Sequence, residues 1–139
     1  MGKAQFDTSS IVIPSTLKKL VTVERFAEKF ANKNGLTEEE KDNLAIAVTE
    51  AVNNAIVHGN KSDHSKKVHV EFSISENKLR AVIRDEGNGF DPNNLSNPTD
   101  PENLLKESGR GIFILKSLMD DVSFSFSSKG TEIILTKKL

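Results

Sequence analysis

Hydrophobic residues recur at helical spacing near the beginning of the chain. Ile11–Ile13 lie before Pro14 and are expected to form the end of a strand. The next segment is predicted to be a helix that begins after a cap at Ser15 or Thr16 and stops at Gly35. The apolar stripe of this helix consists of Leu20, Val23, Ala27, Phe30 and Ala31.

A second amphipathic helix is predicted from Thr37 to about His58. Thr37 and Glu40 have the spacing of a capping box, in which each side chain accepts a hydrogen bond from the backbone N–H of the other residue. Gly59 is expected to end this helix in a left-handed conformation. The apolar stripe consists of Leu44, Val48, Ala51 and Ala55.

After residue 60 the hydrophobic period changes to two, which is typical of strands with one buried face. The alternation occurs in two pairs of segments, joined by predicted turns at Glu76–Asn77 and Lys129–Gly130. These four segments are therefore expected to form two hairpins of one sheet. The apolar positions are Val68, Val70, Phe72, Ile74, Leu79, Ala81, Ile83, Val122, Phe124, Phe126, Ile133 and Leu135.

A long polar stretch, Asp91 to Ser108, separates the two hairpins and precedes a helix predicted over Gly109–Met119. Loops of this length inside a compact domain are usually functional or mobile, so we interpret the stretch as a lid. The fold class is therefore α+β, with two layers: a mixed or antiparallel sheet covered on one face by about three helices. Residues 1–139 are expected to be a single domain.

Composition narrows the classes of function. The 139 residues carry a formal net charge of −1, which gives no electrostatic reason to expect nucleic acid or an anionic membrane as a partner. The absence of cysteine excludes disulfides, thiolate metal sites and cysteine nucleophiles. The first seven residues have no apolar region typical of a secretion signal, and runs such as Ile112–Leu115 are too short to cross a bilayer. A cytoplasmic protein is expected.

Three polar residues follow one another at helical spacing on the second helix. Glu50, Asn54 and His58 share one side of the helix, directly beside its apolar stripe. A solvated carboxylate normally points away from the core, so this position at the core edge is unusual. An amphipathic boundary, with a salt-bridging glutamate and a capping histidine, is the alternative interpretation.

A glycine-rich turn follows the third predicted strand. Gly87 and Gly89 alternate after Asp85, so a ligand could approach the backbone closely, and the carboxylate could accept a hydrogen bond from an exocyclic amine. An ordinary turn is the alternative. A calcium loop is disfavoured because Gly87 and Ser96 occupy the third and twelfth positions, where acidic ligands are required.

Two further glycine motifs lie in the second half of the chain. Gly109-Arg110-Gly111 opens a helix, whose free backbone N–H groups and positive dipole end are suited to phosphate. The chain has no Walker A lysine motif and no Rossmann glycine pattern after a strand. Gly130-Thr131 lies in the last hairpin, where the hydroxyl could contact a phosphate or merely cap a turn.

In this order the motifs resemble the four sequence boxes of the Bergerat-type ATP-binding fold, found in gyrase, the heat-shock chaperone ATPase, sensor histidine kinases and mismatch-repair ATPases. The resemblance covers nearly the whole chain. The motif Glu50-Ala-Val-Asn-Asn54-Ala-Ile-Val-His58-Gly is most similar to the corresponding motif of the anti-sigma-factor serine kinases. Members of that group are commonly dimers, so the resemblance allows a homodimer.

The resemblance implies roles for individual residues in binding ATP with Mg²⁺. Glu50 matches the general base, Asn54 the magnesium ligand, and Asp85 the carboxylate that binds the adenine amine. Thr131 matches the hydroxyl near the terminal phosphate. The remaining positions expected to contact the nucleotide are His58, Gly87, Gly89, Phe90, Gly109, Arg110, Gly111 and Ile112.

The function implied by the resemblance is a serine/threonine kinase of a partner-switching module. Such a protein binds a sigma factor in one state and, in another, phosphorylates an anti-anti-sigma protein with ATP. One alternative is a nucleotide-controlled regulatory module with weak or no kinase activity. Another is a stand-alone histidine-kinase-like ATPase domain, which is disfavoured because none of the histidines, His58, His64 and His69, lies in a phosphoacceptor helix pair.

One position departs from the kinase pattern. Some members of the kinase group carry an arginine just before the Ser-Gly of the third box, and Glu107 stands there in this chain. Arg110, between the two glycines, is the residue that could supply the missing charge. The departure bears on phosphotransfer and not on phosphate recognition.

Overall fold

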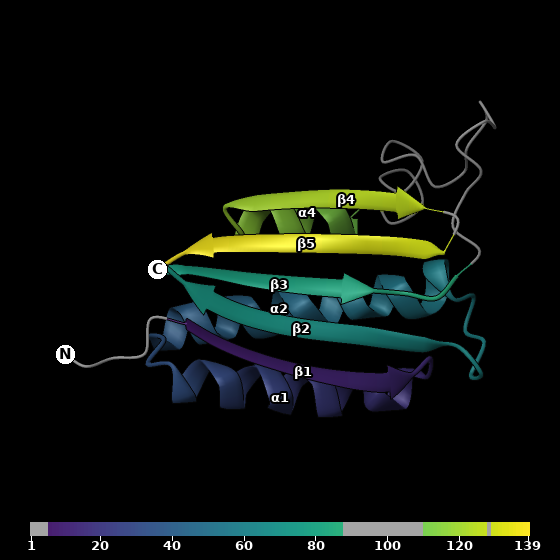
Figure 1. The fold of residues 1–139 in the computed structure, drawn as a ribbon, viewed down its shortest axis with the longest axis horizontal. Helices are drawn as coiled ribbons and strands as arrows, with labels where there is room; N and C mark the ends of the chain where they lie inside the picture. The colour runs from purple at the N-terminus through teal and green to yellow at the C-terminus, as the bar shows by residue number, and fades with distance from the viewer. Residues whose placement is uncertain (1–5, 88–109, 128) are drawn as a thin grey trace.

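The computed structural model describes residues 6–87, 110–127 and 129–139, which form one sheet with helices packed on it (Figure 1). The strands are β1 (Phe6–Pro14), β2 (Lys67–Ser75), β3 (Lys78–Arg84), β4 (Asp121–Ser127) and β5 (Gly130–Lys138). The α-helices are α1 (Leu20–Lys33), α2 (Glu38–Asn54) and α4 (Arg110–Leu118). A short 3-10 turn, η1 (Leu17–Lys19), precedes α1, and a π-helical turn, η2 (Ala55–Gly59), continues α2.

The sheet has the order β1-β2-β3-β5-β4, and all four pairings of neighbouring strands are antiparallel. The three α-helices lie behind one face of this sheet (Figure 1). The predicted α+β class with two layers is therefore confirmed, and of the two sheet types that the sequence allowed, the antiparallel one is present. No described helix covers the opposite face.

The hydrophobic core lies between the sheet and the helices. It contains the predicted stripes of both long helices and the inward positions of the strands. Phe72 on β2 is fully buried, and its ring lies 5.3 Å from the rings of both Phe26 and Phe30 on α1, measured between centroids. Such aromatic contacts add to the free energy gained by burying apolar area. The core fixes α2 against the sheet, and α2 carries the candidate site.

The beginning of the first helix differs from the prediction. Neither Ser15 nor Thr16 caps α1, because η1 intervenes and the helix begins at Leu20. The hydroxyl of Ser15 instead donates a hydrogen bond to the carbonyl of Lys66, at 2.7 Å. Gly35 has a φ of +70° directly after the helix, as predicted for its stop.

The predicted capping box of α2 is present, since Glu40 N donates to Thr37 Oγ1 and Thr37 N donates to Glu40 Oε1. The predicted left-handed stop at Gly59 is wrong. Gly59 belongs to η2, and the left-handed residues follow it, at Lys61 and Ser62. The physical need for glycine at position 59 is a close contact, described below, and not a positive φ.

Both predicted hairpins are present. Glu76 and Asn77 have φ angles of 54° and 63°, which is the geometry of a tight two-residue turn between β2 and β3. Gly130, with a φ of 143°, begins β5 after the second turn. The predicted lid lies outside the described residues. No described helix is long and apolar enough to cross a membrane.

Candidate functional site

The three polar residues that share one side of the second predicted helix lie near the end of α2 and in η2. Asn54 is the last residue of α2 and is buried, while Glu50 and His58 are half-buried on either side of it. The turn after Asn54 is wider than an α-helical turn, because Asn60 N donates to the carbonyl of Ala55, five residues earlier, at 2.8 Å. Such π-turns occur frequently at functional sites. The predicted placement of the three side chains at the core edge is confirmed.

Asn54 has an amide group that the fold does not satisfy. Its side chain is 6% exposed, and Nδ2 has no hydrogen-bond partner among the described residues. Buried polar atoms without a partner are rare, because an unmade hydrogen bond in a low-dielectric interior is costly. The Nδ2 atom is therefore available to donate a hydrogen bond to a ligand. No cluster of three or more histidine or acidic side chains, of the kind that holds a metal by itself, occurs in the described residues.

Glu50 lies against the beginning of α4. A Cβ atom at Gly111 would overlap the Oε2 atom of Glu50 and would lie 3.2 Å from its Cδ. Burial raises the pKa of the Glu50 carboxyl, and the imidazole of His58 partly opposes this effect. Glu50 is thus a carboxylate with raised basicity, next to the helix start that the sequence analysis associates with phosphate.

Asp85 occupies the other end of the site, directly after β3. Its side chain is 4% exposed, and Oδ1 accepts hydrogen bonds from the backbone N–H groups of Gly87 and Thr131, both at 3.0 Å. Oδ2 has no hydrogen bond within the described residues. Burial raises the pKa of Asp85, against the lowering effect of these two backbone bonds and of the Lys66 charge. One oxygen is fixed by the protein and the other remains available.

Glycines surround the Asp85 carboxylate closely. A Cβ atom at Gly59 would overlap Oδ2 of Asp85, and one at Gly87 would overlap the carbonyl oxygen of Gly59. A Cβ atom at Gly130 would lie 2.9 Å from Oδ1 of Asp85. Gly59 and Gly130, from two separate segments, therefore approach Asp85 at distances that only glycine permits, and Gly87 approaches Gly59 in the same way. The sequence analysis identified Gly87 at this position but missed Gly59.

Thr131 lies at the Asp85 end of the site. Besides the bond from Thr131 N to the carboxylate, Asp85 N donates to the carbonyl of Thr131 at 3.0 Å. A single residue cannot lie within hydrogen-bonding distance of a carboxylate that binds the base and also beside the terminal phosphate. The expected role near the terminal phosphate therefore conflicts with the expected role of Asp85.

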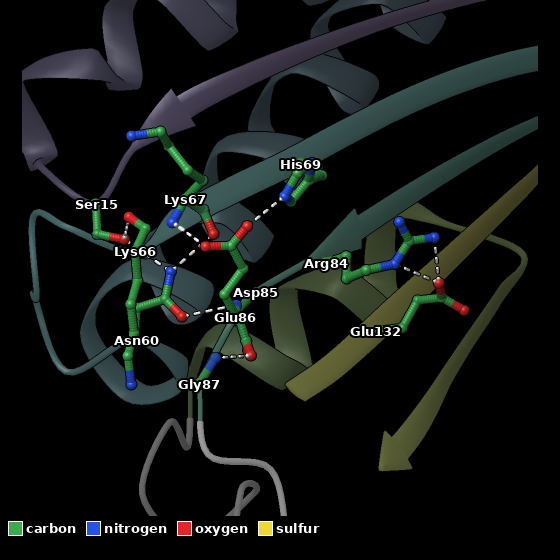
Figure 2. Close-up of polar contacts among 10 residues, drawn as sticks. All are labelled: Ser15, Asn60, Lys66, Lys67, His69, Arg84, Asp85, Glu86, Gly87 and Glu132. Carbon is green, nitrogen blue, oxygen red and sulfur yellow. Dashed lines mark hydrogen bonds and ion pairs between the residues drawn. The ribbon is translucent and has the colours of Figure 1, made fainter. Parts of the chain in front are cut away.

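A buried hydrogen-bond network supports the turn that follows Asp85 (Figure 2). The side chain of Asn60 is fully buried, and its Oδ1 accepts from the backbone N–H of Glu86 at 2.8 Å. Its Nδ2 donates to Ser15 Oγ at 2.7 Å and to the carbonyl of Lys67 at 3.0 Å. The sequence analysis missed this network, because nothing in the local sequence distinguishes Asn60 from an exposed loop residue.

Glu86 forms a second connection from the same turn to β2. Its carboxylate accepts from the backbone N–H of Lys67 at 2.8 Å and pairs with Nε2 of His69 at 2.7 Å (Figure 2). The hydrogen bond with His69 lowers the pKa of Glu86, and the bond from the backbone of Lys67 lowers it further by a smaller amount. His69 on β2 thus has a partner beside the site.

Several predicted site residues cannot be placed in the same detail. Gly89, Phe90 and Gly109 lie outside the described residues. Arg110 and Ile112 belong to the first turn of α4 by their backbone. The structure brings Glu50 and Gly111 together beside the last turns of α2, and Asp85, Gly87 and Thr131 together beside the end of η2.

Comparisons with known proteins identify the family of this chain. A model of the histidine kinase-like ATPase domain family matches residues 13–137. A serine-protein kinase RsbW of Oceanobacillus iheyensis is 32% identical over 113 residues, which are 77% of this chain and 71% of that protein. An anti-sigma F factor of Clostridium perfringens is 38% identical over 108 residues, which are 74% of this chain and 76% of that protein.

Solved structures have the same fold. A Mycobacterium tuberculosis chain with RsbU and RsbW domains has a TM-score of 0.72 at 18% identity, over 96% of this chain and 32% of that one. The histidine kinase domain from Erythrobacter litoralis EL346 has a TM-score of 0.56 at 16% identity, over 91% of this chain and 62% of that one. The resemblance inferred from the four boxes is thus confirmed, and the chain belongs to the family of histidine kinase-like ATPase domains.

Proposed function

We propose that this chain is a serine/threonine kinase that binds Mg²⁺-ATP and phosphorylates a serine of an anti-anti-sigma protein. In its other state it binds a sigma factor as an anti-sigma factor. Relatives named serine-protein kinase RsbW and anti-sigma F factor support this proposal. The geometry supports it independently, through two carboxylates held apart by α2–η2: Glu50 on the helix and Asp85 packed against Gly59 at its end.

The observation that carries the proposal is the span of α2–η2. Gly59 lies against Asp85, and Glu50 lies against Gly111 at the start of α4. Gly59 follows Glu50 by nine positions, which corresponds to about 13 Å at the rise of an α-helix. A base-binding carboxylate and a phosphate-binding helix start are therefore held apart on the scale of a nucleoside triphosphate.

Asp85 would bind the base. Oδ2 can accept a hydrogen bond from the exocyclic amine of adenine, while the bonds from Gly87 N and Thr131 N hold Oδ1 in place. The absence of a side chain at Gly59 and Gly87 lets the end of η2 pack directly against Asp85 and its turn, which fixes the carboxylate. We assign Thr131 to the base end of the site, in place of the terminal phosphate.

The phosphates would lie at the other end. The first backbone N–H groups of α4 lack partners within the helix and are directed toward an anion at its N-terminus. Asn54 is the residue that would hold Mg²⁺ through its amide oxygen, as the family resemblance implies, since such oxygens are suitable ligands for this ion. Its buried Nδ2, which has no partner in the described residues, could donate a hydrogen bond to a phosphate oxygen. When bound, the ion would neutralise charge on the phosphate oxygens.

Glu50 would act on the acceptor hydroxyl. The hydroxyl oxygen forms a bond to the γ-phosphorus, the bond from that phosphorus to the bridging oxygen of ADP breaks, and the carboxylate of Glu50 takes the hydroxyl proton. A raised pKa makes Glu50 a stronger base than an exposed glutamate, because burial disfavours its charged form. ADP and a phosphoserine are the products.

A Gly59→Ala variant should bind ATP about tenfold more weakly, because the added methyl group occupies the position of Asp85 Oδ2 and displaces the carboxylate. Calorimetric titration measures the change. A double-mutant cycle provides the control, since Gly59→Ala should have little further effect in an Asp85→Ala background, where the methyl group has space. Equal losses in both backgrounds would contradict the proposed contact.

A Gly111→Ala variant should transfer phosphate about tenfold more slowly with little change in ATP affinity. The new methyl group overlaps the end of the Glu50 side chain, which can move aside without unfolding the protein. Single-turnover kinetics measures the rate. In a Glu50→Gln background the same substitution should not lower the rate further, and a full additional loss would show that Gly111 acts independently of Glu50.

The function is tested by incubating the protein with Mg²⁺-ATP and its cognate anti-anti-sigma protein and measuring the intact mass of the latter. A gain of one phosphate supports the kinase. ADP release without that gain indicates an ATPase, and neither result indicates a module that responds to nucleotide by binding alone. Glu107 stands where some members of the kinase group carry an arginine, which makes a module with weak or no kinase activity a specific alternative.

A further inference from the structure

Asn60 is the centre of the buried polar network beside the site. Its side chain is fully buried and makes hydrogen bonds to Ser15, Lys67 and Glu86, which follow β1, begin β2 and follow β3. One amide thus joins the end of η2 to three strands (Figure 2). Its oxygen and both of its N–H groups have partners, which is the complete satisfaction that a buried amide requires.

The bond to Glu86 bears directly on the base end of the site. Glu86 lies between Asp85 and Gly87, so its backbone N–H belongs to the same short turn that positions the carboxylate. Gly59, which contacts Asp85 and Gly87, is the residue immediately before Asn60. Residues 59 and 60 therefore support this turn both by close packing and by a hydrogen bond.

The turn has few other restraints. Within the described residues it is held by the two bonds to Asp85 Oδ1, by the backbone pairing of Asp85 N with Thr131, and by the contacts of the Glu86 side chain with Lys67 and His69. The Glu86 side chain is about two-fifths exposed, and such exposed pairs stabilise weakly. The part-buried bond from Glu86 N to Asn60 Oδ1 directly links this turn to the residue that follows η2.

We infer that Asn60 is a positioning residue that sets the place of Asp85 Oδ2, and hence the preference of the site for adenine, without touching the nucleotide. This inference rests on the proposed assignment of Asp85 to the base. Loss of the Asn60 oxygen leaves the part-buried Glu86 N–H without its protein partner, so the turn is expected to shift until that group bonds water. The carboxylate moves with the turn.

The test compares ATP with inosine triphosphate, whose base has a carbonyl oxygen where adenine has its amine. The wild type should prefer ATP, because Asp85 Oδ2 can only accept a hydrogen bond. In Asn60→Ala this preference, expressed as the ratio of the two dissociation constants, should fall about tenfold. The ratio does not depend on the folded fraction, since unfolded chains bind neither nucleotide. Asn60→Ser, whose hydroxyl is too short to replace the amide, should behave in the same way if Asn60→Ala folds poorly.

Ser15→Ala is the matched control. It removes two hydrogen bonds of the same network but leaves the bond from Glu86 N to Asn60 intact. It should destabilise the fold without changing the nucleotide preference. A preference that is unchanged in both Asn60 variants, or lowered equally by Ser15→Ala, would overturn the positioning role.

The Asp85→Asn variant distinguishes failure of the proposed function from failure of the inference about Asn60. If the wild type showed no preference for ATP and Asp85→Asn changed nothing, Asp85 would not bind the base, and the inference about Asn60 would fall with it. If Asp85→Asn lowers the preference and Asn60→Ala does not, Asp85 binds the base and Asn60 serves the fold alone.

Discussion

A Glu50→Gln variant is expected to bind ATP as the wild type does and to transfer phosphate about 100- to 10,000-fold more slowly, the usual cost of losing a general base. Glu50 contacts the first turn of α4 and is distant from Asp85, so the amide leaves the base end of the site untouched. Single-turnover transfer to the anti-anti-sigma protein measures the rate, and calorimetry measures the affinity.

The pH dependence gives the same experiment a second readout. Only the carboxylate form of Glu50 can take a proton, so the transfer rate should fall as the pH is lowered through the pKa of this group. Because burial raises that pKa above its ordinary value of 4.5, the fall should begin at a higher pH than for an exposed glutamate. The transfer rate of the Glu50→Gln variant should not show this fall at low pH.

Stability provides the control for Glu50→Gln. A carboxyl with a raised pKa in the folded state contributes stability below its unfolded pKa and loses it as the pH rises through its folded pKa. Glutamine avoids that loss, so the variant should unfold at neutral pH no more easily than the wild type. A wild-type transfer rate would make Glu50 a structural residue of α2, and loss of ATP binding would contradict its assignment to the acceptor side.

An Asp85→Asn variant is expected to bind ATP about 10- to 100-fold more weakly, the range that follows from one mismatched buried hydrogen bond. The asparagine oxygen can keep the bonds from Gly87 N and Thr131 N, so the turn is retained. Its Nδ2 then occupies the place of Oδ2 and directs a donor at the adenine amine, which is itself a donor.

Inosine triphosphate makes this prediction specific to the base. The carbonyl of inosine accepts a hydrogen bond from the new amide, so Asp85→Asn should lose affinity for ATP but not for inosine triphosphate. Calorimetry with both nucleotides measures the two affinities. Equal losses for both would indicate general damage to the site, and unchanged affinity for ATP in a folded variant would rule out the role of Asp85.

The elements with strong local signals could be predicted from the sequence. The stripe of α1, the capping box at Thr37 and the hairpin turn at Glu76–Asn77 each depend on residues close together in the chain, and each is present. The beginning of α1 could not be predicted in the same way. Ser15 has a cap-forming side chain, but a partner 51 residues away, the carbonyl of Lys66, takes its hydroxyl.

Some residues of the candidate site could likewise be predicted from the sequence, and others could not. The residues of the four boxes could be found because their order resembles a known family, and the core-edge position of Asn54 followed from helical spacing. Gly59 was expected to form a left-handed stop, yet its Cα packs against Asp85, which lies 26 residues later in the chain. Asn60 and the His69–Glu86 pair were missed for the same reason: tertiary contacts determine their roles, and no local pattern marks them.

The central claim is that the base lies at Asp85 and the phosphates lie between Asn54 and the first turn of α4. A crystal structure with Mg²⁺ and a non-hydrolysable ATP analogue tests it most directly. We expect the adenine amine within hydrogen-bonding distance of Asp85 Oδ2 and the phosphates beside Gly111, with the ion on Asn54. An analogue bound in the reverse direction, or at another surface of the protein, would contradict it.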